Sequence, residues 1–307
     1  MTEGSLSCVS SSPSITSLTT VNAQTIRAQP HPDWIVSADG QVWVTGVREG
    51  VAVYEPESGR LLASIPIPGE TCGAPDVGFG SVWIPTSGEP AIYRVSSASR
   101  TLLARIPVEL PAAGEFSIGV GEGGVWAAEG NPNVGCRLVR IDPTTNEVDA
   151  SYDIAAGAGS VRAGLGGIWI TCFEEDKLLR VDPKSGRTIS TIGTERGPRF
   201  LAVGVGGIWV LNQTSASISR IDPANDTVVA TIPVDRRSIR GGDISVGNGS
   251  IWVRASEELV VRIDPTTNAV VQRIGSPSTG SASAAECEGH LWISAGAEGL
   301  LYNIPIP

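Results

Sequence analysis

The sequence predicts an all-β fold made of repeated small sheets. Three observations lead to this prediction: a tryptophan recurs about every forty residues, a glycine-rich turn precedes it, and a proline-containing turn follows most copies. The steps between consecutive members are 40, 43, 43, 40, 43 and 40 residues, and the series consists of Trp43, Trp83, Trp126, Trp169, Trp209, Trp252 and Trp292. A period near forty is typical of propeller blades or of helical pairs. Because no helical spacing of apolar residues persists, strands are favoured.

Each repeat contains four short strands. One strand follows a glycine-rich turn and carries the tryptophan, as in VGVGGIWV at 203–210. A later apolar run ends in an Asp-Pro turn, as in ISRIDPANDTVV at 218–229, and this turn chemistry closes a hairpin. Four strands in about forty residues form one blade of a β-propeller, with strand A beside a central channel and strands B, C and D further out. The repeated tryptophans, on strand B, are expected to pack between blades.

Seven blades close into a ring only if the N-terminus completes the last one. After Trp292 the chain has only ISAGAEGLLYNIPIP, which is enough for strand C but not for strand D. The stretch TTVNAQTIRAQ at 19–29 resembles TTNAVVQRIG at 266–275, where an earlier repeat has its fourth strand. We therefore expect residues 19–29 to pair with LLYNIPIP, which removes an exposed sheet edge.

The domain organisation follows from the same count. Residues 1–18 are rich in Ser and Thr and poor in large apolar groups, so a flexible tail is expected there. Residues 19–307 are expected to form a single seven-bladed propeller domain, and we expect a monomer.

Composition disfavours two classes of partner. The formal net charge of −10 would repel a nucleic-acid backbone or an anionic membrane surface. No apolar run is long enough for a membrane span, and the N-terminus lacks the basic-then-apolar order of a signal peptide. Two locations stay open: the cytoplasm, or export with the signal already removed.

Four aromatic residues are predicted at the channel mouth, on the face formed by the D–A and B–C loops: Trp34, Phe116, Phe173 and Phe200. Aromatic surface around a channel with a few polar groups is the composition of a small-molecule site. The alternative is that these rings pack between blades at the rim, and spacing does not decide between the two. Polar residues at comparable rim positions are His31, Asp33, Glu115, Glu129, Asn131, Arg199, Asn212, Arg240 and Asp243.

Several of these polar residues suggest chemistry. Glu129 and Asn212 each stand three residues after their tryptophan, so they could share a divalent cation such as Mg²⁺ or Ca²⁺ with Asp33 or Asp243. His31 follows the closing strand and could act as a general base; the alternative is a solvated loop histidine.

Charged residues also occur deeper in the channel and beside the rim. Arg199 and Arg240 would suit an anionic substrate group. Asp76 and Arg162 share one position, seven residues before their tryptophans, and are expected to point into the channel as a structural charge pair or, alternatively, as catalytic groups.

The cysteines leave two alternatives open. Five is an odd number, and no CxxC pair of the metal-binding type occurs. Cys72, Cys136 and Cys172 map to loops of the rim face in three successive blades. Cys72 could pair with His31 for nucleophilic catalysis, or two neighbouring cysteines could form a disulfide in an exported protein.

The glycine-turn-tryptophan strands followed by Ile-Asp-Pro turns, over residues 19–307, resemble the seven-bladed YVTN and NHL-like propellers. Among enzymes they resemble the streptogramin B (virginiamycin B) lyase family. This resemblance implies ring opening of a cyclic peptide lactone by elimination, with a magnesium ion polarising the ester and a histidine base in the last blades. The chain departs from it in its histidines, since His290 falls in an A–B turn, on the face opposite the usual active site.

Three functions therefore remain. The first is a metal-assisted lyase with His31 as base, a cation held by Glu129, Asn212 and Asp243, and substrate contacts from the four rim aromatics with Arg199 and Arg240. The second is a non-catalytic propeller that binds a peptide or protein partner. The third is a lactonase-like hydrolase that uses the same metal with water as the nucleophile.

Overall fold

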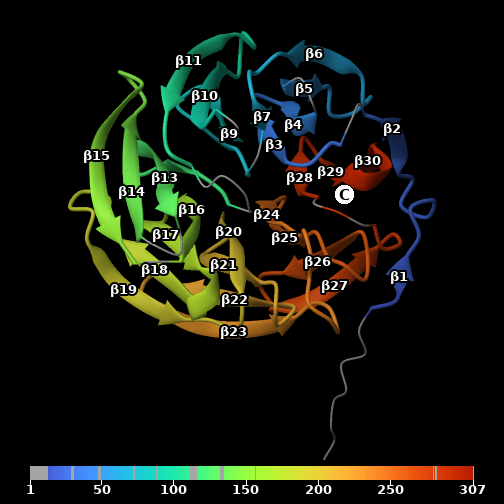
Figure 1. Ribbon diagram of the computed structural model, residues 1–307. Coiled ribbons are helices and arrows are strands. Elements are labelled where there is room, and N and C mark those ends of the chain that lie inside the picture. Colours follow the sequence, from blue (N-terminus) through green and yellow to red (C-terminus); the bar gives the residue numbers. More distant parts are fainter. Residues whose placement is uncertain are drawn as a thin grey trace, which may run out of the picture.

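Seven small antiparallel sheets stand around a common axis in the computed structural model of the chain (Figure 1). The structure describes residues 13–28, 31–47, 50–71, 73–87, 89–110, 116–131, 135–155, 157–278, 280 and 282–306. Each sheet is one blade, and the predicted seven-bladed propeller is confirmed. Within the described residues, no helix is long and apolar enough to span a membrane.

The first three blades follow the predicted order from the axis outward. Blade 1 consists of β3 (Ile35–Ala38), β4 (Gln41–Val47), β5 (Gly50–Tyr54) and β6 (Leu61–Ile65). Blade 2 consists of β7 (Glu70–Thr71), β8 (Asp76–Gly78), β9 (Ser81–Ser87), β10 (Ala91–Ser96) and β11 (Leu102–Pro107). Blade 3 consists of β12 (Gly119–Gly121), β13 (Gly124–Asn131), β14 (Gly135–Asp142) and β15 (Glu147–Ile154).

Blades 4 and 5 repeat this arrangement. Blade 4 consists of β16 (Ala158–Gly164), β17 (Gly167–Cys172), the 3₁₀ turn η1 (Phe173–Glu175), β18 (Lys177–Val181) and β19 (Thr188–Gly193). Blade 5 consists of β20 (Pro198–Gly204), β21 (Gly207–Asn212), β22 (Ser217–Asp222) and β23 (Thr227–Pro233).

The last two blades each take a strand from the N-terminus. Blade 6 consists of β24 (Ile244–Gly247), β25 (Ser250–Val253), β26 (Val260–Asp264) and β27 (Ala269–Ile274), with β1 (Ile15–Thr16) outside them. Blade 7 consists of β28 (Ala284–Cys287), β29 (His290–Ala295), η2 (Gly296–Glu298), β30 (Leu300–Pro305) and β2 (Gln24–Arg27).

Ring closure is confirmed. β2 pairs antiparallel with β30, from Gln24 opposite Asn303 to Arg27 opposite Leu300, and Ala28 N donates to Gly299 O at 3.0 Å. Ile26 packs against a core cluster shared by blades 7 and 1. The N-terminal strand therefore supplies the outer strand that the last repeat lacks.

The flexible tail predicted for residues 1–18 does not extend through residues 15–18. Ile15 and Thr16 form β1, which pairs in parallel with Arg273 and Ile274 of β27, and Leu18 packs against the core between blades 6 and 7. The outer edge of blade 6 offers unpaired backbone groups, and even a short extended segment can satisfy them. Residues 1–12 lie outside the described residues.

The repeated tryptophans form the inter-blade core, as predicted. Their exposed fractions are between 0% and 1%. In blades 2 to 5 the indole N–H donates to the carbonyl of the glycine five residues earlier, over 2.9 to 3.1 Å; the acceptors are Gly78, Gly121, Gly164 and Gly204. In these four blades the glycine-rich turn therefore also provides the acceptor that the buried indole N–H requires.

In three blades an arginine on strand C connects to the turn of the next blade, and these residues are Arg94, Arg180 and Arg220. Arg180 lies over the Trp169 ring, 5.0 Å from its centroid, and donates to Pro223 O and Asp226 Oδ1 in the next blade, at 2.9 and 2.8 Å. Arg220 makes the same contacts with Trp209 in its own blade and with Pro265 O and Asn268 Oδ1 in the next. One side chain therefore covers the core tryptophan and holds the adjacent turn.

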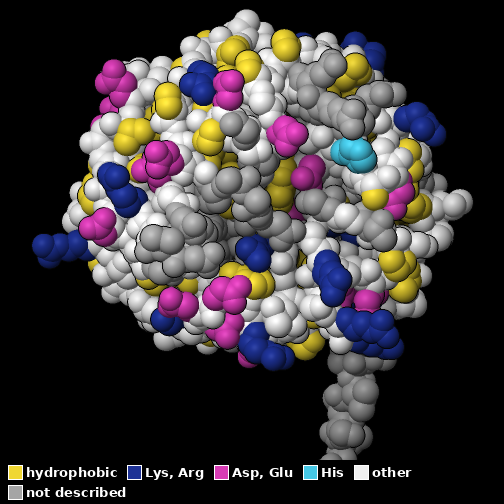
Figure 2. All heavy atoms as spheres, in the orientation of Figure 1, with side chains coloured by type: hydrophobic (Ala, Val, Ile, Leu, Met, Phe, Trp, Pro, Cys, Tyr) yellow, Lys and Arg dark blue, Asp and Glu magenta, His cyan; other side chains and the backbone are white. Residues whose placement is uncertain are grey.

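The surface is mixed in charge. Figure 2 shows acidic, basic and hydrophobic side chains interspersed over one face, with a hollow near its centre. The acidic excess of the chain therefore does not gather into a single patch on this face.

Candidate functional site

An axial cavity of about 290 Å³ lies between the A strands. All seven blades line it, and the lining is made of Ile35, Val36, Ser37, Pro75, Asp76, Val77, Val120, Arg162, Ala163, Ala202, Val203, Asp243, Ile244, Ser245, Val246, Ala285 and Glu286. Five valines and three alanines give it apolar walls. Four of its side chains carry a formal charge.

Two aromatic rings from distant blades meet next to the strands that line this cavity. The rings of Trp34 and Phe200 contact each other edge to face, with centroids 5.0 Å apart. Trp34 directly precedes β3 of blade 1 and Phe200 belongs to blade 5, so the indole reaches across the axis between blades that are not neighbours. In the sequence of their blades, the cavity-lining residues come after Trp34 and after Phe200, nearer to the A–B turn. The cavity therefore lies on the side of the A–B turns.

This arrangement decides between the two interpretations of three rim aromatics. Trp34, Phe116 and Phe200 are only 3%, 3% and 1% exposed, and each belongs to a buried hydrophobic cluster. They pack between blades and are not open ligand surface. The spacing of these aromatic residues in the sequence could not predict their burial, because burial depends on how closely neighbouring loops approach one another at the axis.

The fourth aromatic and the two rim arginines lie nearer the surface. Phe173 is half-buried, and the Arg199 guanidinium lies over its ring, 3.7 Å from the centroid. Arg240 is exposed, and its backbone N–H donates to Ser256 Oγ at 2.9 Å. Arg199 and Phe173 therefore form one stacked pair between blades 4 and 5, while Arg240 lies on a loop of blade 6.

His31 lies beside blade 7, where chain order placed it. Its side chain is exposed, its φ is 58°, and Nδ1 is 3.1 Å from Gly296 O. If Nδ1 carries the proton and donates to this carbonyl, Nε2 is left as a basic nitrogen.

The three predicted metal ligands lie in three different blades. Glu129 of blade 3 accepts from Glu109 N at 3.0 Å, and Asn212 of blade 5 donates to Ser217 and Ser219 Oγ at 3.2 and 2.9 Å. Asp243 of blade 6 accepts from Ser283 Oγ at 2.8 Å. Among the described residues, no group of three or more His, Cys, Asp or Glu side chains is close enough to hold a metal ion. Each of the three side chains has a hydrogen-bond partner of its own, and the cation stays a prediction.

The described rim cysteines are buried thiols. Cys136 and Cys172 are free and share a core cluster between blades 3 and 4. Burial raises the pKa of Cys172 to about 12 and also raises that of Cys136, so neither is poised as a thiolate nucleophile. Cys72, Glu115 and the Asn131 side chain lie outside what the structure describes.

Asp76 and Arg162 both line the cavity, as their shared position predicts. Asp76 accepts from Val77 N at 2.9 Å and from Val120 N at 2.8 Å, and Arg162 Nη1 donates to Ile118 O and, at 3.3 Å, to Val161 O. Burial raises the pKa of the Asp76 carboxyl, and the positive charge of Arg162 partly offsets that rise. Backbone contacts therefore fix both charged groups within the cavity wall.

Glu286 is a third charged group of the wall, and sequence reasoning missed it. Its Oε1 accepts from Gly289 N at 2.8 Å in the A–B turn of blade 7. The other blades have different residues at this position, so the repeat pattern itself contained no signal for it.

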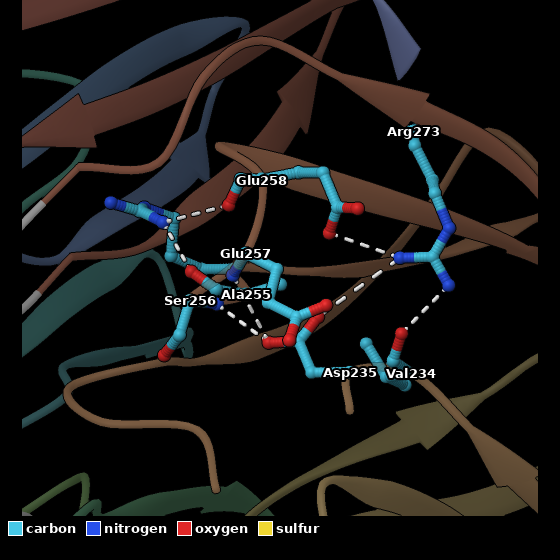
Figure 3. A network of polar contacts seen from close by, with 8 residues as sticks. Val234, Asp235, Ala255, Ser256, Glu257, Glu258 and Arg273 are labelled. Atoms are coloured by element: carbon cyan, nitrogen blue, oxygen red, sulfur yellow. Dashed lines mark hydrogen bonds and ion pairs between the residues drawn. The ribbon is translucent and has the colours of Figure 1, made fainter. Parts of the chain in front are cut away.

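A buried charge network supports the wall at blade 6 (Figure 3). Arg273 Nη1 lies 3.0 Å from Glu258 Oε2 and 4.0 Å from Asp235 Oδ1, while Nη2 donates to Val234 O at 2.7 Å. Asp235 Oδ2 in turn accepts from Ser256 N at 2.8 Å. This network holds the loop between the two short strands β25 and β26 against blade 5.

Arg254 connects the same network to the cavity. Its guanidinium donates to Ala255 O and Glu258 O, and its backbone N–H donates to Asp243 O at 2.9 Å. Burial lowers the pKa of Arg254 to about 10 and raises those of Asp235 and Glu258. The charges were visible in the sequence as RASEEL at 254–259, but their burial was not.

The chain is similar in fold to solved structures of known proteins. No family model and no curated protein matches the chain. Among solved structures, virginiamycin B lyase from Staphylococcus aureus superposes with a TM-score of 0.76, covering 93% of this chain and 99% of the lyase at 15% identity. The chain shares the propeller fold of this lyase. The propeller BamB from Moraxella catarrhalis is similar at a TM-score of 0.59 and 10% identity, covering 89% of this chain and 82% of BamB.

Proposed function

We propose that this propeller binds a small polar molecule in its axial cavity. The observation that supports the proposal is a cavity of about 290 Å³ whose apolar walls carry the charged groups of Asp76, Arg162 and Glu286. Ligand pockets typically have volumes from roughly 300 Å³ upward and combine apolar walls with a few placed polar groups. Backbone contacts hold the side chains of Asp76 and Arg162, so these groups need little reordering when a ligand enters.

The test is a thermal-shift screen with amino acids, amines, carboxylic acids, sugars and nucleosides, followed by calorimetry on the hits. A ligand that binds only the folded protein raises the unfolding midpoint by mass action. In the variant Ser37→Phe, a ring is added at an exposed position of the cavity wall. We expect hits with the unchanged protein and loss of the shift in this variant.

The matched control is Ser99→Phe, which adds the same ring at an exposed turn away from the cavity. Its shifts should equal those of the unchanged protein. The proposal is wrong if no compound shifts the midpoint, or if Ser37→Phe responds as strongly as Ser99→Phe.

A second candidate function is lyase activity at the loop face. Two observations favour it: the fold is similar to that of virginiamycin B lyase, and His31 is exposed with Nδ1 next to the Gly296 carbonyl. In this role Nε2 of His31 would remove a proton from the substrate, and the Arg199 and Phe173 pair would lie beside the reacting ring.

Virginiamycin B is the direct substrate probe, with mass spectrometry as the readout. Elimination opens the ring without a change of mass and leaves an alkene, whereas a lactonase-like hydrolysis adds one water. His31→Gln should abolish either product, and arms with Mg²⁺, with Ca²⁺ and with EDTA test the predicted cation. An intact substrate in all arms removes both enzymatic alternatives and leaves a peptide or protein partner as the competing function.

A further inference from the structure

We infer that the axial cavity selects a dipolar ligand, one that carries an ammonium group and a carboxylate on a short aliphatic chain. This inference rests on the proposed binding function and specifies its ligand. It is based on how the charged side chains are distributed around the axis. Asp76, Glu286 and Asp243 belong to blades 2, 7 and 6, whereas Arg162 belongs to blade 4. The cavity therefore has an acidic side and a basic side.

The basic side is built to present one guanidinium. Gly119 stands between Arg162 and Asp76, and a Cβ on this glycine would lie 2.8 Å from the backbone of Arg162. Blade 3 therefore has no room for a side chain at this level, and Arg162 supplies the cation of the cavity lining. Its Nη1 is anchored on two carbonyl groups, whereas a guanidinium has five N–H donors in total. A carboxylate is the group that such a planar fork binds best.

The acidic side is built to receive a cation. Asp76 accepts two backbone N–H groups and Glu286 accepts one, although a carboxylate can accept about four hydrogen bonds. Burial raises the pKa of Asp76, and the charge of Arg162 and two backbone hydrogen bonds offset only part of that rise. A bound ammonium group would neutralise this buried charge and would therefore be favoured over a neutral polar group.

The space between the two sides is apolar. Val36, Val77, Val120, Val203 and Val246 line it. A short methylene chain between the two charged ends would fill this space, whereas a sugar or another polyhydroxy compound would leave its hydroxyl groups without partners.

The experiment compares probes that differ in chain length and in charge. Calorimetry is run with the series glycine, 3-aminopropanoate, 4-aminobutanoate and 5-aminopentanoate, and with butylamine and butanoate as the singly charged analogues. We expect one member of the series to bind at least about tenfold more tightly than either analogue, because each desolvated charge-assisted contact adds that much discrimination. Arg162→Met should reduce the preferred amino acid to the affinity of butylamine, and Asp76→Asn should reduce it to that of butanoate.

The outcomes separate this inference from the proposed function. If neutral, cationic or anionic compounds bind as tightly as the amino acids, and Ser37→Phe blocks them, the cavity is a ligand site but the inference is wrong. If no compound of either panel binds, the inference and the proposed binding function are both wrong. The comparison of probes on the unchanged protein needs no variant, so the inference stays testable even if Arg162→Met does not fold.

Discussion

Removal of residues 1–28 is expected to abolish the soluble monomeric propeller, whereas removal of residues 1–12 should leave the soluble yield and unfolding midpoint unchanged. The longer deletion takes away β2, which pairs with β30 along its whole length, and β1, which covers β27. It also removes Leu18, Val21 and Ala23 from the core between blades 6 and 7. Two open strand edges would then be free to pair with other chains.

An intermediate deletion separates the two N-terminal strands. Removal of residues 1–17 takes away β1 but keeps β2, so it should lower the midpoint without preventing folding. Soluble yield, size-exclusion profile and unfolding midpoint are compared for the three deletions. Equal behaviour of the shortest and the longest deletion would show that β2 does not hold the ring closed.

Arg273→Met is expected to destabilise the protein by about 3 to 5 kcal/mol, the usual cost of removing one partner from a buried ion pair. Arg273 is 8% exposed and Glu258 is 4% exposed, so the variant would leave the carboxylates of Glu258 and Asp235 buried without their cation. Chemical denaturation at pH 7 measures the loss. Arg187→Met at an exposed position is the control and should change stability by no more than about 0.5 kcal/mol.

The sign of the pH dependence follows from the two carboxyl groups. Burial already raises the pKa values of Asp235 and Glu258 above their usual range, and loss of Arg273 would raise them further. A carboxyl group with a raised folded-state pKa binds more protons in the folded state, so stability rises as the pH falls through that pKa. The defect of Arg273→Met should therefore shrink as the pH falls below 7. A defect that is constant or grows over this range would mean that the carboxylates are not its source.

The architecture could be predicted because its signals are local and repeated. A glycine turn, an apolar run with a tryptophan and an Asp-Pro turn each depend on a few neighbouring residues, and their recurrence defined the blades and the closing role of residues 19–29. The positions of Asp76 and Arg162 at the channel followed from the same repeat. Each sequence repeat forms one blade, because the turns that define a blade lie within its own repeat.

Which side chains meet at the axis depends on contacts between distant blades. The sequence placed Trp34 and Phe200 at the rim, but their contact across the axis depends on the convergence of blades 1 and 5. In the same way, the burial of Asp235, Glu258 and Arg273 depends on three separate segments that enclose them. Burial and the resulting pKa shifts arise from long-range packing, which a local pattern does not encode. Local turns and strands therefore predict the ring and its closure, whereas the packing of seven blades around one axis sets which residues line the cavity.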